Sequence, residues 1–291
     1  MKTSAEEKKT KKRSQLYETW KRLRKNRLAV LGLVILALII IMAVFAKQIA
    51  PYPYDAQDYS STFQFPSREH WMGTDNYGRD IFSRVIYGTR TSLQIGFIAL
   101  LGGAVVGSVL GAISGYFGGI TDTIIMRFTD VLMAIPRTVL AIAIATTLGA
   151  GLTNAVIAVA ISSIPNFARV VRASTLTVKD QEYVEAAKCI GAKSPHIIWK
   201  HIFPNVLAPI IVQATLGVGT AIILAAALSF LGLGVQPPVP EWGSMLSAAR
   251  TYMRDYWYMV AFPGLAIMVT VLALNLFGDG LRDALDPKLK K

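Results

Sequence analysis

Five long runs without a charged residue divide the chain and predict its architecture. They cover residues 28–46, 92–121, 138–168, 206–240 and 256–278. A helix that crosses the hydrocarbon core of a bilayer needs roughly 20 apolar residues. Inside that core only helices and closed barrels satisfy every backbone hydrogen bond. Runs of this length therefore predict an all-α polytopic membrane protein.

The run 138–168 is too long for one spanning helix. Its middle contains the sequence LGAGLTN (148–154), which is typical of a turn. One helix is therefore expected over 124–148 and the next over 153–171. The complete set is six transmembrane helices, the others lying near 28–46, 93–115, 206–233 and 256–277.

Charged residues make up 16% of the chain, against about 25% in a soluble domain. With the N-terminus inside, the inside segments carry 22 of the 30 Lys and Arg residues, and the outside loops 47–91 and 234–255 carry seven. This positive-inside distribution predicts cytoplasmic N- and C-termini. It accounts for the net charge of +12 without nucleic acid, because the basic tail 1–27 suits anionic membrane lipid. The run 28–46 is too long for a signal peptide, so we interpret it as an uncleaved first span.

The polar segment 177–205, between two of these spans, carries the signals of two short helices. Thr177 and Asp180 match a capping box, which predicts a helix through QEYVEAAKCI. Gly191 is placed to end that helix. A second helix, HIIWKHI, is expected to stop before Pro204, because the residue before a proline avoids the helical region. The pair is expected at the inner membrane surface.

The first of these helices offers a surface suited to close approach. Ala186 and Ala187 are small, and Glu185 beside them adds a charge, a combination that suits docking into a groove of a soluble partner. The alternative is an amphipathic helix lying on the headgroups, with Val184, Ala187 and Ile190 facing the lipid. The spacing alone leaves both interpretations open.

The stretch EAAKCIGAKSPHIIWKHIFPN resembles the EAA loop of ABC-transporter permeases. The matching positions are Glu185, Ala186, Ala187, Gly191, Ile202 and Pro204. In that family the loop is the coupling helix, which inserts into a cleft of the cytoplasmic ATPase. The resemblance therefore implies ATPase docking by Glu185, Ala186, Ala187, Gly191 and Pro204.

Three further stretches narrow the resemblance. The second, C-type subunit of the dipeptide/oligopeptide/nickel permease family is similar to this chain in GTDNYGRDIFSRVIYGTRTSL (73–93), LSFLGLGVQPPVPEWGSML (228–246) and NLFGDGLRDALDPKLK (275–290). Together with the EAA loop, these matches occur in the expected order. The resemblance covers the chain from the first span to the C-terminus.

The resemblance implies a type-1 ABC importer permease and a definite organisation. The expected parts are a basic cytoplasmic tail (1–27), a first transmembrane helix (28–46), an extracytoplasmic loop with an interfacial helix (47–91), the type-1 transmembrane domain (92–280) and a cytoplasmic tail (281–291). The implied partners are a homologous permease subunit, two cytoplasmic ATP-binding subunits and an extracytoplasmic solute-binding protein. The chain itself is then non-catalytic and without a cofactor, because the ATPases bind ATP and Mg²⁺. The implied cargo is a dipeptide or oligopeptide, with nickel or another small solute as the alternative.

Other functions fit the residues less well. An ion-coupled secondary carrier would be expected to show acidic residues in mid-span, and a membrane enzyme would need paired carboxylates or metal ligands near a span end. CIGAKS lacks the glycine that a phosphate loop requires before Lys193. His196 and His201 are spaced i, i+5 rather than the i, i+4 of a zinc helix. No ATP or metal site is expected in this chain, and its single cysteine, Cys189, excludes an internal disulfide.

Small residues recur every fourth position in the second span. They are Gly103, Gly107, Gly111 and Gly115. Ridges of this kind let helices pack closely in lipid. We interpret them as packing positions, within this subunit or against a partner permease, in preference to a ligand role.

Three charged residues fall in or near the third span. Arg127 and Asp130 are spaced i, i+3 and are expected to pair near the inner surface. Arg137 lies deeper and follows Pro136, so it should face the bundle interior or a cavity. Two hypotheses remain for Arg137: it lines the translocation path and meets a substrate carboxylate, or it pairs with another helix.

Two apolar groups are expected at the outer surface. An interfacial helix leading into the second span is indicated by Ile81, Phe82, Val85 and Ile86. An aromatic belt before the last span is indicated by Tyr252, Tyr256, Trp257 and Tyr258.

Overall fold

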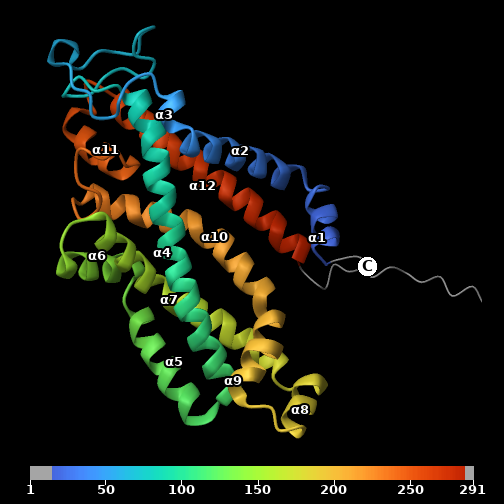
Figure 1. Ribbon diagram of the computed structural model, residues 1–291. Helices are drawn as coiled ribbons and strands as arrows, with labels where there is room; N and C mark the ends of the chain where they lie inside the picture. The colour runs from blue at the N-terminus through green and yellow to red at the C-terminus, as the bar shows by residue number, and fades with distance from the viewer. Residues whose placement is uncertain (1–14, 286–291) are drawn as a thin grey trace, which may run out of the picture.

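The computed structural model describes residues 15–285, and within this range its regular elements are helices (Figure 1). The α-helices are α1 (Gln15–Leu23), α2 (Arg27–Val44), α3 (Ala46–Ile49), α4 (Ile81–Phe117), α5 (Gly119–Ala134), α6 (Arg137–Leu148), α7 (Leu152–Val178), α8 (Glu182–Cys189), α9 (Ser194–Ile197), α10 (Phe203–Phe230), α11 (Trp242–Ala249) and α12 (Tyr258–Leu285). Short 3-10 turns η1 (Tyr59–Ser61) and η3 (Arg250–Tyr252) and a π-helical turn η2 (Ile198–Ile202) complete the set. Of the expected tails 1–27 and 281–291, the parts 1–14 and 286–291 lie outside the described residues.

Five helical segments are long and apolar enough to cross a membrane, namely α2, α4, α7, α9 through α10, and α12. A sixth span exists if α5 and α6 are counted together, and these two helices are bent by 91° at their junction. The all-α polytopic class is confirmed, but the straight helix expected over 124–148 is wrong. Ile135 and Pro136 are both extended, with ψ of 128° and 133°. The residue before a proline avoids the helical region, so the helix ends there and restarts at Arg137.

The longest of the described helices, α4, connects the two ends of the molecule (Figure 1). Its 37 residues correspond to about 56 Å at 1.5 Å per residue, nearly twice the thickness of a hydrocarbon core. Asp80 begins the helix by accepting a hydrogen bond from the Ser83 N–H at 2.7 Å. Ile81, Val85 and the Arg84 side chain are buried. A separate interfacial helix is therefore a wrong prediction: this stretch is the N-terminal end of α4, covered by protein.

The glycine ridge joins α4 to α7. A Cβ atom added at Gly103, Gly107, Gly111 or Gly115 would lie 2.7, 2.6, 2.3 or 2.7 Å from an atom of α7. For the first three, the nearest atom is a backbone carbonyl oxygen, so the two backbones are in direct contact. The ridge thus lies inside this subunit rather than against a partner.

A second close pair is formed by α2 and α12. A Cβ atom at Gly32 would lie 2.7 Å from the Ala273 carbonyl oxygen, and one at Gly280 would lie 2.2 Å from the Ala29 Cβ. The helix α1 lies beside the C-terminal part of α12 (Figure 1). Both ends of the described chain therefore emerge at the same place.

The loop 47–80 forms a cap at one end of the molecule (Figure 1). Its Phe63 ring stacks on Tyr256 at a centroid distance of 4.4 Å. Tyr258 is fully buried, and its hydroxyl donates to the Thr74 carbonyl oxygen at 3.2 Å. The aromatic belt is therefore wrong for these two tyrosines, because they hold the cap, whereas Trp257 is exposed.

Candidate functional site

The EAA segment lies at the end of the molecule opposite the cap (Figure 1). The capping box expected at Thr177 is not formed, because α7 continues to Val178 and the Thr177 hydroxyl donates to the Ser174 carbonyl oxygen inside that helix. The helix α8 begins at Glu182, with Gln181 as its N-cap. The polar residues that follow the span thus extend α7 before α8 begins.

Gly191 ends α8 in a left-handed conformation, with a φ of +77°. The Gly191 N–H donates to the Lys188 carbonyl oxygen and the Ala192 N–H to that of Ala187, both at 3.0 Å. This pair of bonds is the Schellman motif. An L side chain at this φ is strained, which explains the glycine at this position.

The second helix does not stop before Pro204, so that prediction is wrong. The chain runs from α9 through the π-helical turn η2 into α10, and Pro204 lies in the first turn of α10. The Phe203 N–H donates to the Ile198 carbonyl oxygen, five residues earlier. A π turn adds a residue to the helical repeat and commonly marks functional positions. The EAA loop is thereby continuous with a spanning helix.

The two faces of α8 have different surroundings. Val184 is fully buried and Ala187 is 5% exposed, and both pack on this subunit's own helices. The opposite face is exposed and carries Glu182, Glu185, Ala186 and Cys189. The headgroup interpretation is therefore wrong for Val184 and Ala187, and the Ala187 side chain faces this subunit's own helices instead of the exposed side of α8.

Ile190 is 84% exposed and was missed as a docking candidate. The sequence signal that would have identified it is an isoleucine directly before the glycine that ends a polar helix. Together with the outward face of α8, it forms what we call the outer face: Glu182, Glu185, Ala186, Cys189, Ile190 and Gly191.

The buried side of α8 connects this loop to the spanning helices. Its two residues belong to one hydrophobic cluster with Ala112 of α4, Val171 of α7 and Val206 of α10. Interiors of proteins are close-packed and transmit displacements. This cluster therefore joins α8 to three spanning helices at once.

Two ion pairs attach α5 to α7. The Asp122 carboxylate accepts hydrogen bonds from Nε and Nη2 of Arg172, each at 2.6 Å, and one from the Ser114 hydroxyl of α4. Asp130 pairs with Arg169 at 2.8 Å. The predicted Arg127–Asp130 pair is therefore wrong, because the carboxylate of Asp130 reaches across to α7 instead of along its own helix.

Arg137 is the first residue of α6, directly after the break. Its Nη2 donates to the Ser163 hydroxyl of α7 at 2.7 Å, and its Nη1 to the Thr220 hydroxyl of α10 at 3.3 Å. Among residues 15–285, no carboxylate forms an ion pair with it. The guanidinium thus lies where three helices meet.

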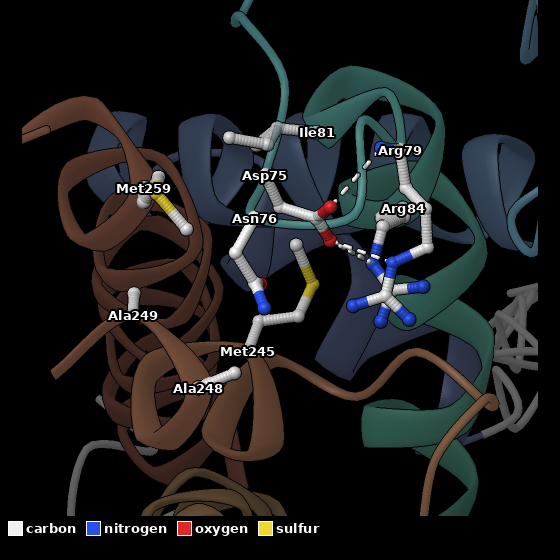
Figure 2. A pocket seen from close by; sticks show the side chains of 9 residues that line it. All are labelled: Asp75, Asn76, Arg79, Ile81, Arg84, Met245, Ala248, Ala249 and Met259. Atoms are coloured by element: carbon white, nitrogen blue, oxygen red, sulfur yellow. Dashed lines mark hydrogen bonds and ion pairs between the residues drawn. The ribbon is translucent and has the colours of Figure 1, made fainter. Parts of the chain in front are cut away.

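Figure 2 shows the buried charges under the cap. The Asp75 carboxylate binds Arg79 Nε at 2.7 Å and lies 3.8 Å from Arg84 Nε. Arg84 also donates to the Tyr54 and Pro238 carbonyl oxygens. The adjoining cavity has a volume of about 20 Å³, which suits a water molecule rather than a peptide. The GTDNYGRD stretch is therefore a structural joint.

The EWG stretch is also held by buried contacts. Glu241 caps α11 by accepting hydrogen bonds from the N–H groups of Gly243 and Ser244, at 2.9 and 2.8 Å. Burial raises the pKa of the Glu241 carboxyl, and these two N–H donors act in the opposite direction. The Trp242 indole donates to the Val85 carbonyl oxygen at 3.1 Å, which fixes α11 on α4.

The described residues contain no group of three His, Cys, Asp or Glu side chains arranged to hold a metal ion. What they do contain is a spanning helical bundle, a packed cap at one end and a two-sided loop helix at the other. This arrangement defines a polytopic helical membrane protein with an exposed loop helix at one end.

Comparisons with known proteins give the family. Residues 91–291 match the family described as "Binding-protein-dependent transport system inner membrane component", and residues 14–66 match "N-terminal TM domain of oligopeptide transport permease C". The chain is 51% identical to the dipeptide transport system permease protein DppC of Alkalihalophilus pseudofirmus, over 94% of this chain and 90% of that protein. It is 49% identical to the glutathione transport system permease protein GsiD of Escherichia coli, over 96% and 92%. A structure of the MetNI methionine ABC transporter in an inward-facing conformation matches with a TM-score of 0.58 and 18% identity, over 71% of this chain and 98% of that chain.

The chain belongs to the peptide/nickel family of ABC-importer permeases and is its C-type subunit. Its fold is that of type-1 importer permeases, and it is a multi-pass protein of the cell membrane.

Proposed function

We propose that this permease carries dipeptides or short oligopeptides inward. The two relatives reported above are named for a dipeptide and for glutathione, itself a short peptide. Their similarity extends over almost the whole chain. Nickel or another small solute is the alternative within the same family.

We infer the set of partners from the family, and the contact with the ATPase from the surroundings of α8. Its inner side is packed and its outer face is uncovered, which is the single observation that supports docking to a separate subunit. The docking partner is a cytoplasmic ATP-binding subunit, one of two in the complex. A homologous permease completes the channel, and a solute-binding protein delivers the peptide at the cap. ATP and Mg²⁺ are bound by the ATPases, and both ends of this chain lie in the cytoplasm.

Coupling then works by displacement. ATP-driven closure of the ATPases moves the outer face of α8, and its buried side shifts α4, α7 and α10 through their common cluster. Because the π turn η2 joins α9 to α10 without a gap, the two form one continuous helical segment.

The substrate is tested by uptake in a strain that lacks this subunit. A labelled dipeptide, a labelled longer peptide and nickel are measured side by side. Loss of peptide uptake with normal nickel uptake is expected, and return of the gene restores it. Loss of nickel uptake alone would contradict the proposal and leave the coupling mechanism intact.

Docking is tested at Cys189, which is exposed on the outer face. In inside-out vesicles, a thiol reagent is expected to label it strongly without ATPases and weakly once they are bound. The control carries Cys189→Ser together with Arg127→Cys on α5, where labelling is expected to stay constant. Equal labelling of Cys189 in both conditions would exclude docking at this face.

A further inference from the structure

The guanidinium of Arg137 has no counterion among the described residues, which sets it apart from the other arginines that bridge helices or lie buried. Those facing a carboxylate are Arg79, Arg84, Arg169 and Arg172. Arg137 is half-buried, and its Nε is enclosed by protein with no hydrogen-bond partner. Its two contacts are to hydroxyl groups, which position the side chain but leave its charge uncompensated. Charged groups inside membrane bundles are normally paired or serve transport.

The backbone adds to the same charge. α6 begins at Arg137 without a side-chain cap and without an acidic residue in its first turn. The positive end of its helix dipole is therefore unopposed. Side chains on a helix lean toward its N-terminus, so the guanidinium and the helix end act on the same space. Broken spanning helices whose half-helices point their N-termini at an anionic group are a recurring arrangement in transporters.

We propose that Arg137 binds the C-terminal carboxylate of the peptide as it passes through the permease. The inference rests on the proposed peptide function and deepens it. A guanidinium has five N–H donors, and the contacts to Ser163 and Thr220 use two. Nη1 and Nη2 each keep one further N–H, and these two donors allow paired hydrogen bonds to a carboxylate. Ser163 and Thr220 are positioning residues that hold the guanidinium between α7 and α10.

The same charge distinguishes between the cargoes of this family. A fixed cation at the junction of three helices attracts an anionic peptide terminus and repels a free Ni²⁺ ion. The positive charge of Arg137 therefore favours passage of a peptide over passage of a nickel ion.

The test uses the complete transporter in proteoliposomes, with both permeases, the ATPases and the solute-binding protein. Uptake of a dipeptide is compared with uptake of its C-terminal amide, each at a concentration that saturates the binding protein. The acid-to-amide ratio is the readout. Because every variant uses the same binding protein and ATPases, a change in this ratio arises in the permease.

Arg137→Gln is expected to lower the acid-to-amide ratio about tenfold, the effect of losing one charge-assisted interaction, while amide uptake continues. Arg137→Lys keeps the charge but loses the planar fork. Its acid-to-amide ratio is therefore expected to lie between those of the wild type and Arg137→Gln. The matched control is Arg127→Gln, which removes an exposed arginine from α5 and is expected to leave the ratio unchanged.

Each other outcome overturns the inference. A normal ratio in Arg137→Gln shows that the residue does not read the carboxylate. If that variant does not insert into the membrane, the uncharged Arg137→Met takes its place, and a normal ratio in it has the same meaning. If purified Arg137→Gln has lost the partner permease, the counterion of Arg137 is a carboxylate of that subunit and not of the peptide. A wild-type transporter that takes up neither peptide refutes the proposed function itself, and thus differs from a failure of this inference alone.

Discussion

Replacing Gly111 with alanine is expected to destabilise this subunit more than any other single-methyl change in the glycine ridge. The new Cβ would lie 2.3 Å from the Ala168 carbonyl oxygen and 2.9 Å from the Arg172 nitrogen, both in the backbone of α7. Backbone atoms in a packed helix cannot rotate away, so α4 and α7 must separate. Overpacking of this kind costs roughly 1–3 kcal/mol. The melting temperature of the purified subunit in detergent is expected to fall by several degrees.

Gly102→Ala is the matched control for that change. It lies nine residues earlier on the same helix, and its Cβ would meet the Ala160 Cβ at 3.5 Å, an ordinary contact. Alanine also has the higher helix propensity, so this variant is expected to melt at or slightly above the wild-type temperature. Equal melting temperatures for the two variants would show that the α4–α7 contact is looser than the structure has it.

Ala186→Trp is expected to abolish coupling while leaving the subunit folded. Ala186 is exposed on the outer face, so a large side chain meets nothing in this chain but blocks close approach of an ATPase. A loss of about 1.4 kcal/mol of docking free energy lowers the affinity about tenfold. A tryptophan placed in a close contact is expected to cost more than this. The ATPases are expected to be lost on purification, and peptide uptake to fall at least tenfold.

The neighbouring positions separate docking from folding. Ala186→Ser adds one atom at the same place and is expected to preserve both assembly and uptake. Ala187→Trp places the bulk inside the subunit, because Ala187 is 5% exposed, and is expected to lower the melting temperature of the isolated subunit. Normal ATPase retention by Ala186→Trp would refute docking through this face.

The spanning helices and the glycine ridge could be predicted because they depend on local composition and on a spacing along one helix. Gly191 was predictable for the same reason: a left-handed residue after a polar helix is a local requirement. The break at Ile135–Pro136 had a local signal too, because the residue before a proline avoids the helical region, although a single helix was expected over 124–148.

Other features depend on contacts that a sequence does not order. The capping box at Thr177 competed with continuation of α7, and the helix continued. Pro204 did not end a helix, because the chain runs through the π turn η2 into α10 and Pro204 lies in the first turn of α10. Asp130 had two arginines within reach and paired with the one on α7. Ala186 and Ala187 look equivalent in the sequence, and only the packing of α8 decides which of them faces outward.

The buried charges under the cap set an order on how the chain can be made. Arg84 is covered by the carbonyl oxygen of Tyr54 and also by that of Pro238, 154 residues later in the chain. Tyr258, still later, holds Thr74 of the cap in place. During synthesis, the cap loop 47–80 and the start of α4 can therefore complete these contacts only after Pro238 and the first residues of α12 have been made. Completion of the cap thus depends on the start of α12, and a chain interrupted before α12 would leave these buried charges open to proteases.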